Sequence, residues 1–238
     1  MDQDPRRRTH RVAVAEEDLA ELSARVTDLL SRAPTGRVLL GLAGEPGAGK
    51  STLASALASR LDARTAVVPL DGFHLADREL ERQGLLRRKG VPETFDAWGY
   101  AALLERLRAR PDHTVYAPGF ERDLEQPLAG AIAVPHEVEV VLTEGNYLLL
   151  DRPEWAAGRA RLDEAWYVGV ESDLRRTRLV ERHVLFGKAQ AEAERWVAEV
   201  DDGNAALVAE SRHRADLVVE LSSTGGSPQT GSRSPTAP

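Results

Sequence analysis

The sequence predicts an α/β fold in which a doubly wound, mainly parallel sheet carries helices on both faces and a helical lid. Short apolar runs of strand length alternate with longer amphipathic segments, as in parallel α/β proteins. A glycine-rich loop stands between one such run and the helical segment that follows it. The chain has 238 residues, 42% of them hydrophobic, which suffices for the core of one domain.

Hydrophobic spacing sets the elements up to the glycine-rich loop. A helix is predicted over 14–32, because apolar residues recur there at spacings of three and four: Leu19, Leu22, Val26, Leu29 and Leu30. The segment Ala-Pro-Thr-Gly at 33–36 ends it. Residues 37–43 form a short apolar run bounded by glycines, which is typical of a buried parallel strand.

The remaining elements follow from the same patterns. Helices are predicted over 50–61, 97–109, 172–186 and 189–210, with a charged helix among the loops of 71–96. Strands are predicted over 66–70, 114–116, 137–143, 164–170 and 215–221. We expect a disordered N-terminus over 1–11, one domain over 12–221 with its lid at about 172–200, and a disordered tail over 222–238.

Composition narrows the class of partner. The net charge is −7, so no overall positive field exists to attract nucleic acid. The chain has no cysteine, which excludes disulfides and thiolate metal sites. No apolar run is long enough to span a membrane, and no secretory signal is visible. We therefore expect a cytoplasmic protein without nucleic-acid or membrane partners, and a homodimer is among the oligomeric states left open.

The glycine-rich loop matches the phosphate-binding pattern G-x-x-x-x-G-K-[ST] between a strand and a helix. Its residues are Gly44, Glu45, Pro46, Gly47, Ala48, Gly49, Lys50 and Ser51, and Thr52 follows in the helix. Backbone N–H groups and the helix N-terminus would hold phosphate oxygens. Lys50 would reach the β- and γ-phosphates, and the Ser51 hydroxyl would ligate Mg²⁺. The alternative is a chance match, which the strand–loop–helix context disfavours.

Two carboxylates follow predicted strands, at the edge of a parallel sheet where ligands gather. Asp71 comes after the strand at 66–70, and Glu144 comes after the strand at 137–143. Phosphoryl transfer to an alcohol needs a carboxylate that accepts the hydroxyl proton and oxygen ligands for Mg²⁺. Asp71 and Glu144, with Ser51, are therefore candidates for both tasks. The alternative is that each acid simply opens a turn.

Basic residues recur on the helix predicted from 172. Arg175, Arg178 and Arg182 are spaced by three and four residues and so share one face. Arginines on a mobile lid would neutralise charge on a phosphoryl group during its transfer, and Arg178 and Arg182 are the candidates. The alternative is a solvated face on which Glu171, Asp173 and Glu181 are the ion-pair partners.

Together these segments resemble the P-loop kinase superfamily that contains uridine kinase, phosphoribulokinase and bacterial type I pantothenate kinase. The resemblance spans about 38–219, and its most specific pieces are GEPGAGKS, LDGFH (70–74), RKGVPETFD (88–96), VYAPGFERDLEQP (115–127) and TEGNYLLL (143–150). It implies a P-loop NTPase fold, Asp71 as the catalytic base, Glu144 as its later acidic partner, and Arg178 and Arg182 as lid arginines. The whole pattern is most similar to a subgroup described as nucleoside/nucleotide kinase-like or sugar (fructose) kinase proteins.

The acceptor side is less defined by this resemblance. Where pantothenate kinases have a Tyr-Ser-His-like segment, this chain has Gly-Phe-Glu-Arg-Asp at 119–123, and uridine kinases lack the Lys-Gly-x-Pro-Glu block. The candidates for acceptor binding are His74, three residues past Asp71, Lys89 in a basic run, Tyr116 at the end of the strand at 114–116, and Arg122 after it. A capping histidine and a solvated basic run are the alternatives for the first two.

The sequence therefore predicts an ATP- and Mg²⁺-dependent kinase that phosphorylates a hydroxyl of a nucleoside, a sugar or a pantothenate-like alcohol. No Asn-Lys-x-Asp guanine-reading motif is present, which favours ATP over GTP. Two alternatives stay open: a P-loop ATPase or nucleotide-sensing regulator without transfer activity, and a structural interaction protein that binds no nucleotide.

Overall fold

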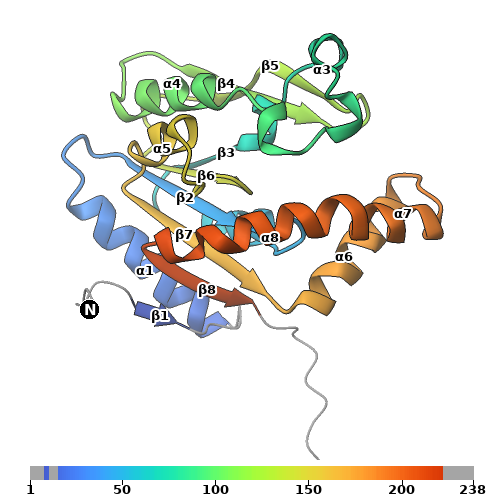
Figure 1. Ribbon diagram of the computed structural model, residues 1–238. Helices are drawn as coiled ribbons and strands as arrows, with labels where there is room; N and C mark the ends of the chain where they lie inside the picture. Colours follow the sequence, from blue (N-terminus) through green and yellow to red (C-terminus); the bar gives the residue numbers. More distant parts are fainter. Residues whose placement is uncertain (1–7, 11–15, 222–238) are drawn as a thin grey trace, which may run out of the picture.

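A six-stranded parallel sheet forms the centre of the computed structural model, which describes residues 8–10 and 16–221 (Figure 1). The strand order is β1-β8-β7-β2-β6-β3, and every neighbouring pair is parallel. Their bounds are β1 Arg8–His10, β2 Val38–Gly44, β3 Thr65–Pro69, β6 Val140–Gly145, β7 Glu164–Val170 and β8 Leu217–Leu221. The expected α/β class with a parallel sheet is confirmed.

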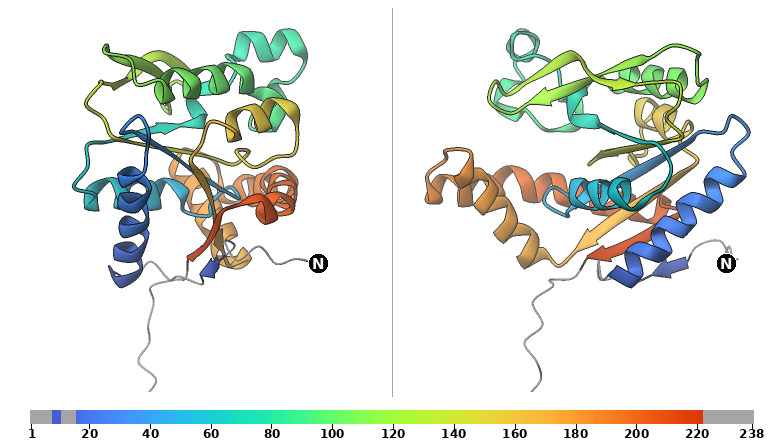
Figure 2. Two further views of the ribbon diagram at one scale, coloured as in Figure 1. Left: turned by 90° about the vertical axis from the view of Figure 1, so that its left-hand side faces the viewer. Right: turned by 180° about the vertical axis from the view of Figure 1, so that it is seen from behind.

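Helices cover both faces of this sheet, as a doubly wound fold requires. Alternate residues of the central strand β2 enter two separate cores: Leu39 packs in one and Leu40 in the other. The second core lies under α1 (Glu16–Ser31) and α2 (Lys50–Arg60), and the first lies under α4 (Ala97–Arg108), α5 (Pro153–Arg159) and α8 (Asp202–Glu210). The two faces are seen in turn in Figure 1 and in the right-hand view of Figure 2.

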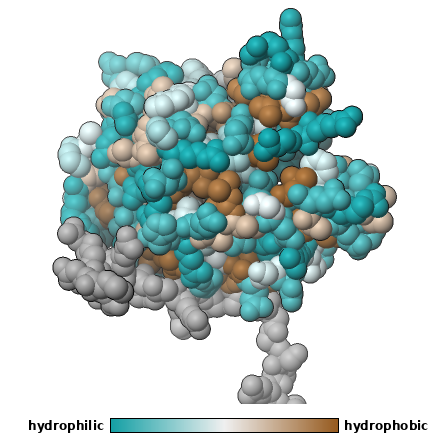
Figure 3. All heavy atoms as spheres, viewed as in Figure 1, coloured by the Kyte–Doolittle hydropathy of each residue, from teal (hydrophilic) through white to brown (hydrophobic). Residues whose placement is uncertain are grey.

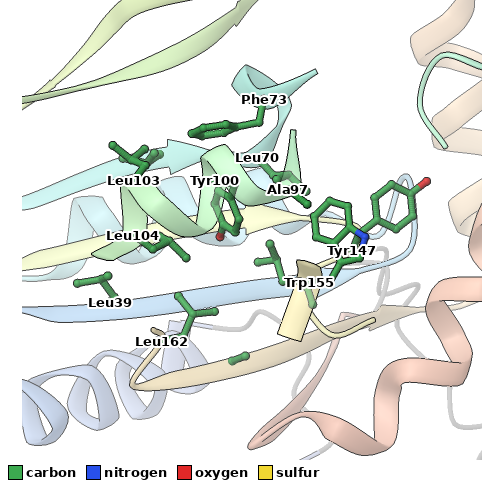
Figure 4. Packing of buried hydrophobic residues seen from close by; sticks show 14 of the residues in the cluster. Leu39, Leu70, Phe73, Ala97, Tyr100, Leu103, Leu104, Tyr147, Trp155 and Leu162 are labelled. Carbon is green, nitrogen blue, oxygen red and sulfur yellow. The ribbon is translucent and has the colours of Figure 1, made fainter. Parts of the chain in front are cut away.

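The first core is rich in aromatic side chains (Figure 4). Tyr100 of α4 is buried, and its hydroxyl lies 2.9 Å from Thr143 Oγ1 of β6. Phe73 meets Tyr100 edge to face with ring centroids 5.4 Å apart, and Tyr147 lies 5.6 Å from Trp155. This packing fixes the segments that follow β3 and β6, where the sequence places Asp71 and Glu144.

A separate antiparallel hairpin, β4 (Val115–Glu121) with β5 (Gln126–Val134), lies beside α4 and the charged helix α3 (Asp77–Gln83). The sequence predicts only a short strand at 114–116 here, so the hairpin is longer than expected. β5 is largely exposed, and β4 alternates between buried and exposed residues only over 115–117. Pro118, Gly119, Pro127 and Gly130 interrupt the strand pattern beyond that point.

Residues 8–10, which belong to the segment over 1–11 that the sequence predicts to be disordered, form β1 and pair in parallel with β8. Three polar residues carry no hydrophobic signal for a strand, and β1 pairs at the open edge of the sheet. Residues 1–7 and the expected disordered tail at 222–238 lie outside the described residues.

The expected lid region is helical and projects from the sheet at the right of Figure 1. It consists of α6 (Ser172–Leu185) and α7 (Gln190–Trp196), and a π-helical turn at Val197–Asp201 joins α7 to α8. The backbone angles at Trp196, Val197, Asp201 and Asp202 are all right-handed helical, so the helix predicted over 189–210 runs through 190–210 with a π turn inside it. Such π turns are frequent at functional sites. Among the described helices, none has both the length and the apolar character needed to cross a bilayer.

Candidate active site

A cavity of about 980 Å³ opens at the carboxyl ends of β2, β3 and β6. The glycine-rich loop forms its floor, the turn after β3 and the β4–β5 hairpin form one wall, and α6, α7 and the π turn form the other. In the space-filling view, apolar side chains gather between the hairpin part and the lid helices (Figure 3). This is the edge at which open parallel α/β sheets bind their ligands.

The loop after β2 has the backbone of a phosphate cradle. Gly47 and Gly49 have φ values of 79° and 98°, and Gly49 caps the N-terminus of α2. Lys50 is buried, and its ammonium donates to the carbonyl oxygens of Gly44 at 3.0 Å and Glu45 at 2.9 Å and to Asn146 Oδ1 at 2.7 Å. Burial lowers the pKa of Lys50, while the nearby carboxylate of Glu144 favours the charged form. All three ammonium hydrogens have acceptors, which supports the protonated state.

Glu144 is brought beside the loop by strand register. In β6 it pairs with Leu42 of β2 on one side and with Pro69 of β3 on the other. Its side chain is buried, and Ser51 Oγ donates to its Oε1 at 2.9 Å. Burial raises the pKa of Glu144, against the attraction of the Lys50 ammonium, and Asp71 adds to the rise.

Asp71 lies two residues past Pro69, so the register that places Glu144 also places Asp71 at the next strand end. It sits in a single 3₁₀ turn, Leu70–Phe73, and lines the cavity. Gly72 lets this turn press against the hairpin, because a Cβ there would lie 2.3 Å from the Pro118 carbonyl oxygen. Asp71, Glu144, Lys50 and Ser51 thus share one cavity.

Three of the four acceptor-binding candidates also line this cavity. His74 and Lys89 lie on the hairpin side, and Lys89 Nζ donates to Asp77 Oδ1 at 2.6 Å and to the Glu125 carbonyl oxygen. Arg122 lies over the ring of the lid residue Phe186, 5.5 Å from its centroid. Tyr116 is 60% exposed and is not among the lining residues, because alternate residues of a strand face opposite sides.

The lid arginines divide into two groups. Arg178 and Arg182 line the cavity, whereas the buried Arg175 points behind the loop. Arg175 Nε lies 3.0 Å from Glu45 Oε2, and its Nη2 donates to Asp202 Oδ1 at 2.5 Å. Arg175 therefore links the loop to α8 and does not face the cavity.

Sequence reasoning missed three contributors to the site. Asn146 accepts from Lys50, and the only signal for it is its position two residues past Glu144. His183 of α6 and Asp201 of the π turn line the cavity as a pair 2.9 Å apart. Their separation of 18 residues in sequence gives no periodic signal.

Comparisons with known proteins give the site its context. No protein-family model matches the sequence. A Schizosaccharomyces pombe protein named as a putative uridine kinase is 35% identical over 183 residues, covering 73% of this chain and 77% of that protein. The chain belongs to the P-loop kinase family. A pantothenate kinase of Leifsonia xyli is 32% identical over 149 residues, 60% of this chain and 45% of that enzyme.

Solved structures agree with the family. A crystal structure titled as a putative fructose transport system kinase from Silicibacter is 39% identical, with a TM-score of 0.75, and covers 84% of this chain and 98% of that one. A circularly permuted P-loop protein from Saccharomyces cerevisiae has a TM-score of 0.74 at 19% identity, and that likeness supports the fold alone. The P-loop NTPase fold is confirmed, and this P-loop kinase is an enzyme that transfers phosphoryl groups.

Proposed function

We propose that this P-loop kinase moves the γ-phosphoryl group of Mg-ATP to a hydroxyl of a small alcohol. A nucleoside, a sugar and a pantothenate-like molecule are the acceptor classes considered. The observation that carries the proposal is the convergence of Lys50, Ser51, Asp71 and Glu144 on one cavity. The names of relatives, a uridine kinase, pantothenate kinases and a fructose transport system kinase, support acceptors of this size.

ATP would bind with its phosphates on the 44–52 loop. Backbone N–H groups and the N-terminus of α2 would hold the phosphate oxygens, and Lys50 would exchange its loop carbonyl acceptors for the β- and γ-phosphates. Arg178 and Arg182 face the same cavity from the lid. They would stabilise negative charge on the phosphoryl group as it moves.

The donors around the loop fit Mg²⁺. Ser51 offers a hydroxyl oxygen and Glu144 a carboxylate, and these hard oxygen ligands suit the ion. No group of three or more His, Cys, Asp or Glu side chains within the described residues could hold a metal by itself. That agrees with Mg²⁺, which usually takes one or two protein ligands and completes its shell with water and phosphate. When bound, it would neutralise charge on the β- and γ-phosphates.

Asp71 is also a candidate metal ligand from the sequence, but we assign it the role of the base that accepts the proton. Its carboxylate would accept the proton of the acceptor hydroxyl as that oxygen attacks the γ-phosphorus and the bond to the β–γ bridging oxygen breaks. Closure of the lid over the cavity would exclude water, which competes with the alcohol as acceptor.

The test is an Asp71→Asn variant. General-base catalysis contributes about 10²–10⁴ in rate, so transfer should fall by that factor while Mg-ATP affinity, measured by calorimetry, stays within a few-fold. Asp112→Asn serves as the control, because its side chain is wholly exposed and away from the cavity.

ADP release is measured with and without a panel of alcohols. Near-wild-type transfer by Asp71→Asn would refute its assignment as the base. ATP consumption that needs no alcohol would favour an ATPase instead, and a protein that binds no nucleotide would refute both readings. Circular dichroism of each variant separates loss of activity from loss of fold.

A further inference from the structure

His74 is held in one orientation by its surroundings. Its ring packs against two phenylalanine rings, with its centroid 3.9 Å from that of Phe95 and 5.1 Å from that of Phe120. Its Nδ1 lies 2.9 Å from the backbone carbonyl oxygen of Asp71. A carbonyl oxygen can only accept, so Nδ1 must carry the hydrogen. The ring can neither flip nor tilt freely without losing this bond.

The other ring nitrogen, Nε2, has no hydrogen-bond partner among the described residues, and the ring lines the cavity. Histidine is mainly neutral above its ordinary pKa of about 6.5. Burial lowers the pKa of His74 further, against the charge of Asp71, and the cation Lys89 acts in the same direction as burial. A neutral ring with its hydrogen on Nδ1 presents a bare lone pair at Nε2.

His74 directly follows the 3₁₀ turn that carries Asp71. The turn is Leu70–Phe73, and the His74 N–H donates to the Asp71 carbonyl oxygen at 3.1 Å. Both residues line the cavity, so one short segment brings two hydrogen-bond acceptors, the Asp71 carboxylate and Nε2, to the cavity wall. A substrate with a single hydroxyl would satisfy only one of them, and the other would lose its water without replacement.

We propose that His74 Nε2 hydrogen-bonds a second hydroxyl of the acceptor, close to the hydroxyl that attacks, so that the substrate is a polyol such as a sugar. This inference rests on the proposed function, since it concerns the acceptor of that reaction. The rings of Phe95 and Phe120, which also line the cavity, offer apolar surface to the C–H groups of such a molecule. His74 is then the residue that selects polyols over simple alcohols.

The first experiment examines the ring itself in the free protein. Side-chain ¹⁵N NMR at neutral pH distinguishes the two neutral tautomers and the imidazolium, and the His74→Asn variant assigns the signal among the six histidines. We expect the form with hydrogen on Nδ1. The Nε2–H tautomer would overturn the inference, whether or not the protein has transfer activity.

The second experiment measures discrimination. The probes are D-ribose, D-fructose and uridine, each beside its monodeoxy analogues, with kcat/KM read from ADP release. Loss of the hydroxyl that His74 contacts should lower kcat/KM of the wild type roughly 10-fold or more, because a buried acceptor is left unpaired. In His74→Asn, which keeps a donor for the Asp71 carbonyl but has no atom at the ε position, parent and analogue should react alike.

A matched pair of variants completes the design. His74→Gln places an amide oxygen near the ε position and should restore part of the discrimination, whereas His113→Asn, at an exposed site, should keep all of it. Transfer that is equal for parent and deoxy analogues, or confined to alcohols with one hydroxyl, would overturn the inference and leave the kinase proposal standing. No transfer to any alcohol would instead refute the proposed function.

Discussion

Replacing Arg175 with methionine should destabilise the protein far more than the same change at its neighbour Arg176. Both arginines of α6 pair with Asp202 of α8, but the Arg175 side chain is 4% exposed and that of Arg176 is 54% exposed. Arg175 also lies 3.0 Å from Glu45 of the phosphate loop. The two substitutions therefore remove the same charge at adjacent positions that differ in burial.

The magnitude follows from that burial. Removing one partner of a buried ion pair costs about 3–5 kcal/mol, because the remaining charge is left without compensation. Glu45 and Asp202 keep 21% and 23% of their side chains exposed, so water can partly replace the arginine. We take the low end, about 3 kcal/mol, which lowers Tm by about 6–12 °C in a domain of this size. Arg176→Met should leave Tm nearly unchanged, since exposed pairs contribute little.

Differential scanning calorimetry at several pH values checks the reasoning. Burial raises the pKa of Asp202, but the hydrogen bonds and charges of Arg175 and Arg176 outweigh it and hold that pKa below its ordinary value. A carboxylate with a lowered pKa stabilises the fold above its unfolded pKa of about 3.9 and loses that effect as the pH falls. The gap in Tm between wild type and Arg175→Met should therefore shrink below about pH 4. Equal losses in the two variants, or an undiminished gap at pH 3, would refute the argument.

Three further predictions concern the site. Glu144→Gln should abolish most transfer and weaken the Mg²⁺ dependence of the rate. Its Tm at pH 7 should be equal to that of the wild type or higher, because burial raises the pKa of Glu144, so that the ionised carboxylate opposes folding. A clear fall in Tm would contradict this. Gly72→Ala should lower the free energy of unfolding in urea by about 1–3 kcal/mol, because the added Cβ clashes with the Pro118 carbonyl oxygen. Gly203→Ala, in a helix with open space around it, should raise that free energy slightly. Similar effects from both variants would count against the packing argument. Lys50→Ala should lower kcat/KM for ATP by about 10²–10³ with the fold intact by circular dichroism, and unchanged turnover would exclude the loop as the ATP site.

The elements that could be predicted were those with a strong local signal. The strand β2 and the helix α2 follow from an apolar run, a glycine loop and a periodic segment, and the structure has them within one residue of the expected bounds. The hairpin β4–β5 could not be predicted beyond its first residues, because β5 is largely exposed and proline and glycine interrupt the pattern of both strands. β1 consists of three polar residues, so the sequence gives no hydrophobic signal for this strand.

The candidate site divides in the same way. The glycine-rich loop, Asp71 and Glu144 follow from a motif and two strand ends. The cavity is lined by Asp71, Glu144 and, from the loop, Pro46, Gly47, Gly49, Lys50, Ser51 and Thr52, whereas Gly44, Glu45 and Ala48 are not among its lining residues. The roles given to them stay predictions. Spacing could not show that Arg175 is buried while Arg178 lines the cavity. Residues three apart on a helix point in directions that differ by only about 60°, so they share a face, and packing alone decides which of them is buried. In the same way, the position of Tyr116 near a strand end did not show whether its side chain faces the cavity or the solvent, and the structure leaves it exposed.

The contact between Gly72 and the hairpin has a consequence for how such enzymes diversify. The hairpin shares no strand with the main sheet, and it carries Arg122 and Phe120 to the cavity while the 44–52 loop is built on β2 and α2. Under the proposed function, changes in hairpin length or sequence would alter which acceptor fits, while the 44–52 loop keeps its place on β2 and α2. Residue 72 is the constraint, because the turn that carries Asp71 packs directly against the hairpin backbone. A hairpin that keeps this close contact requires glycine at position 72.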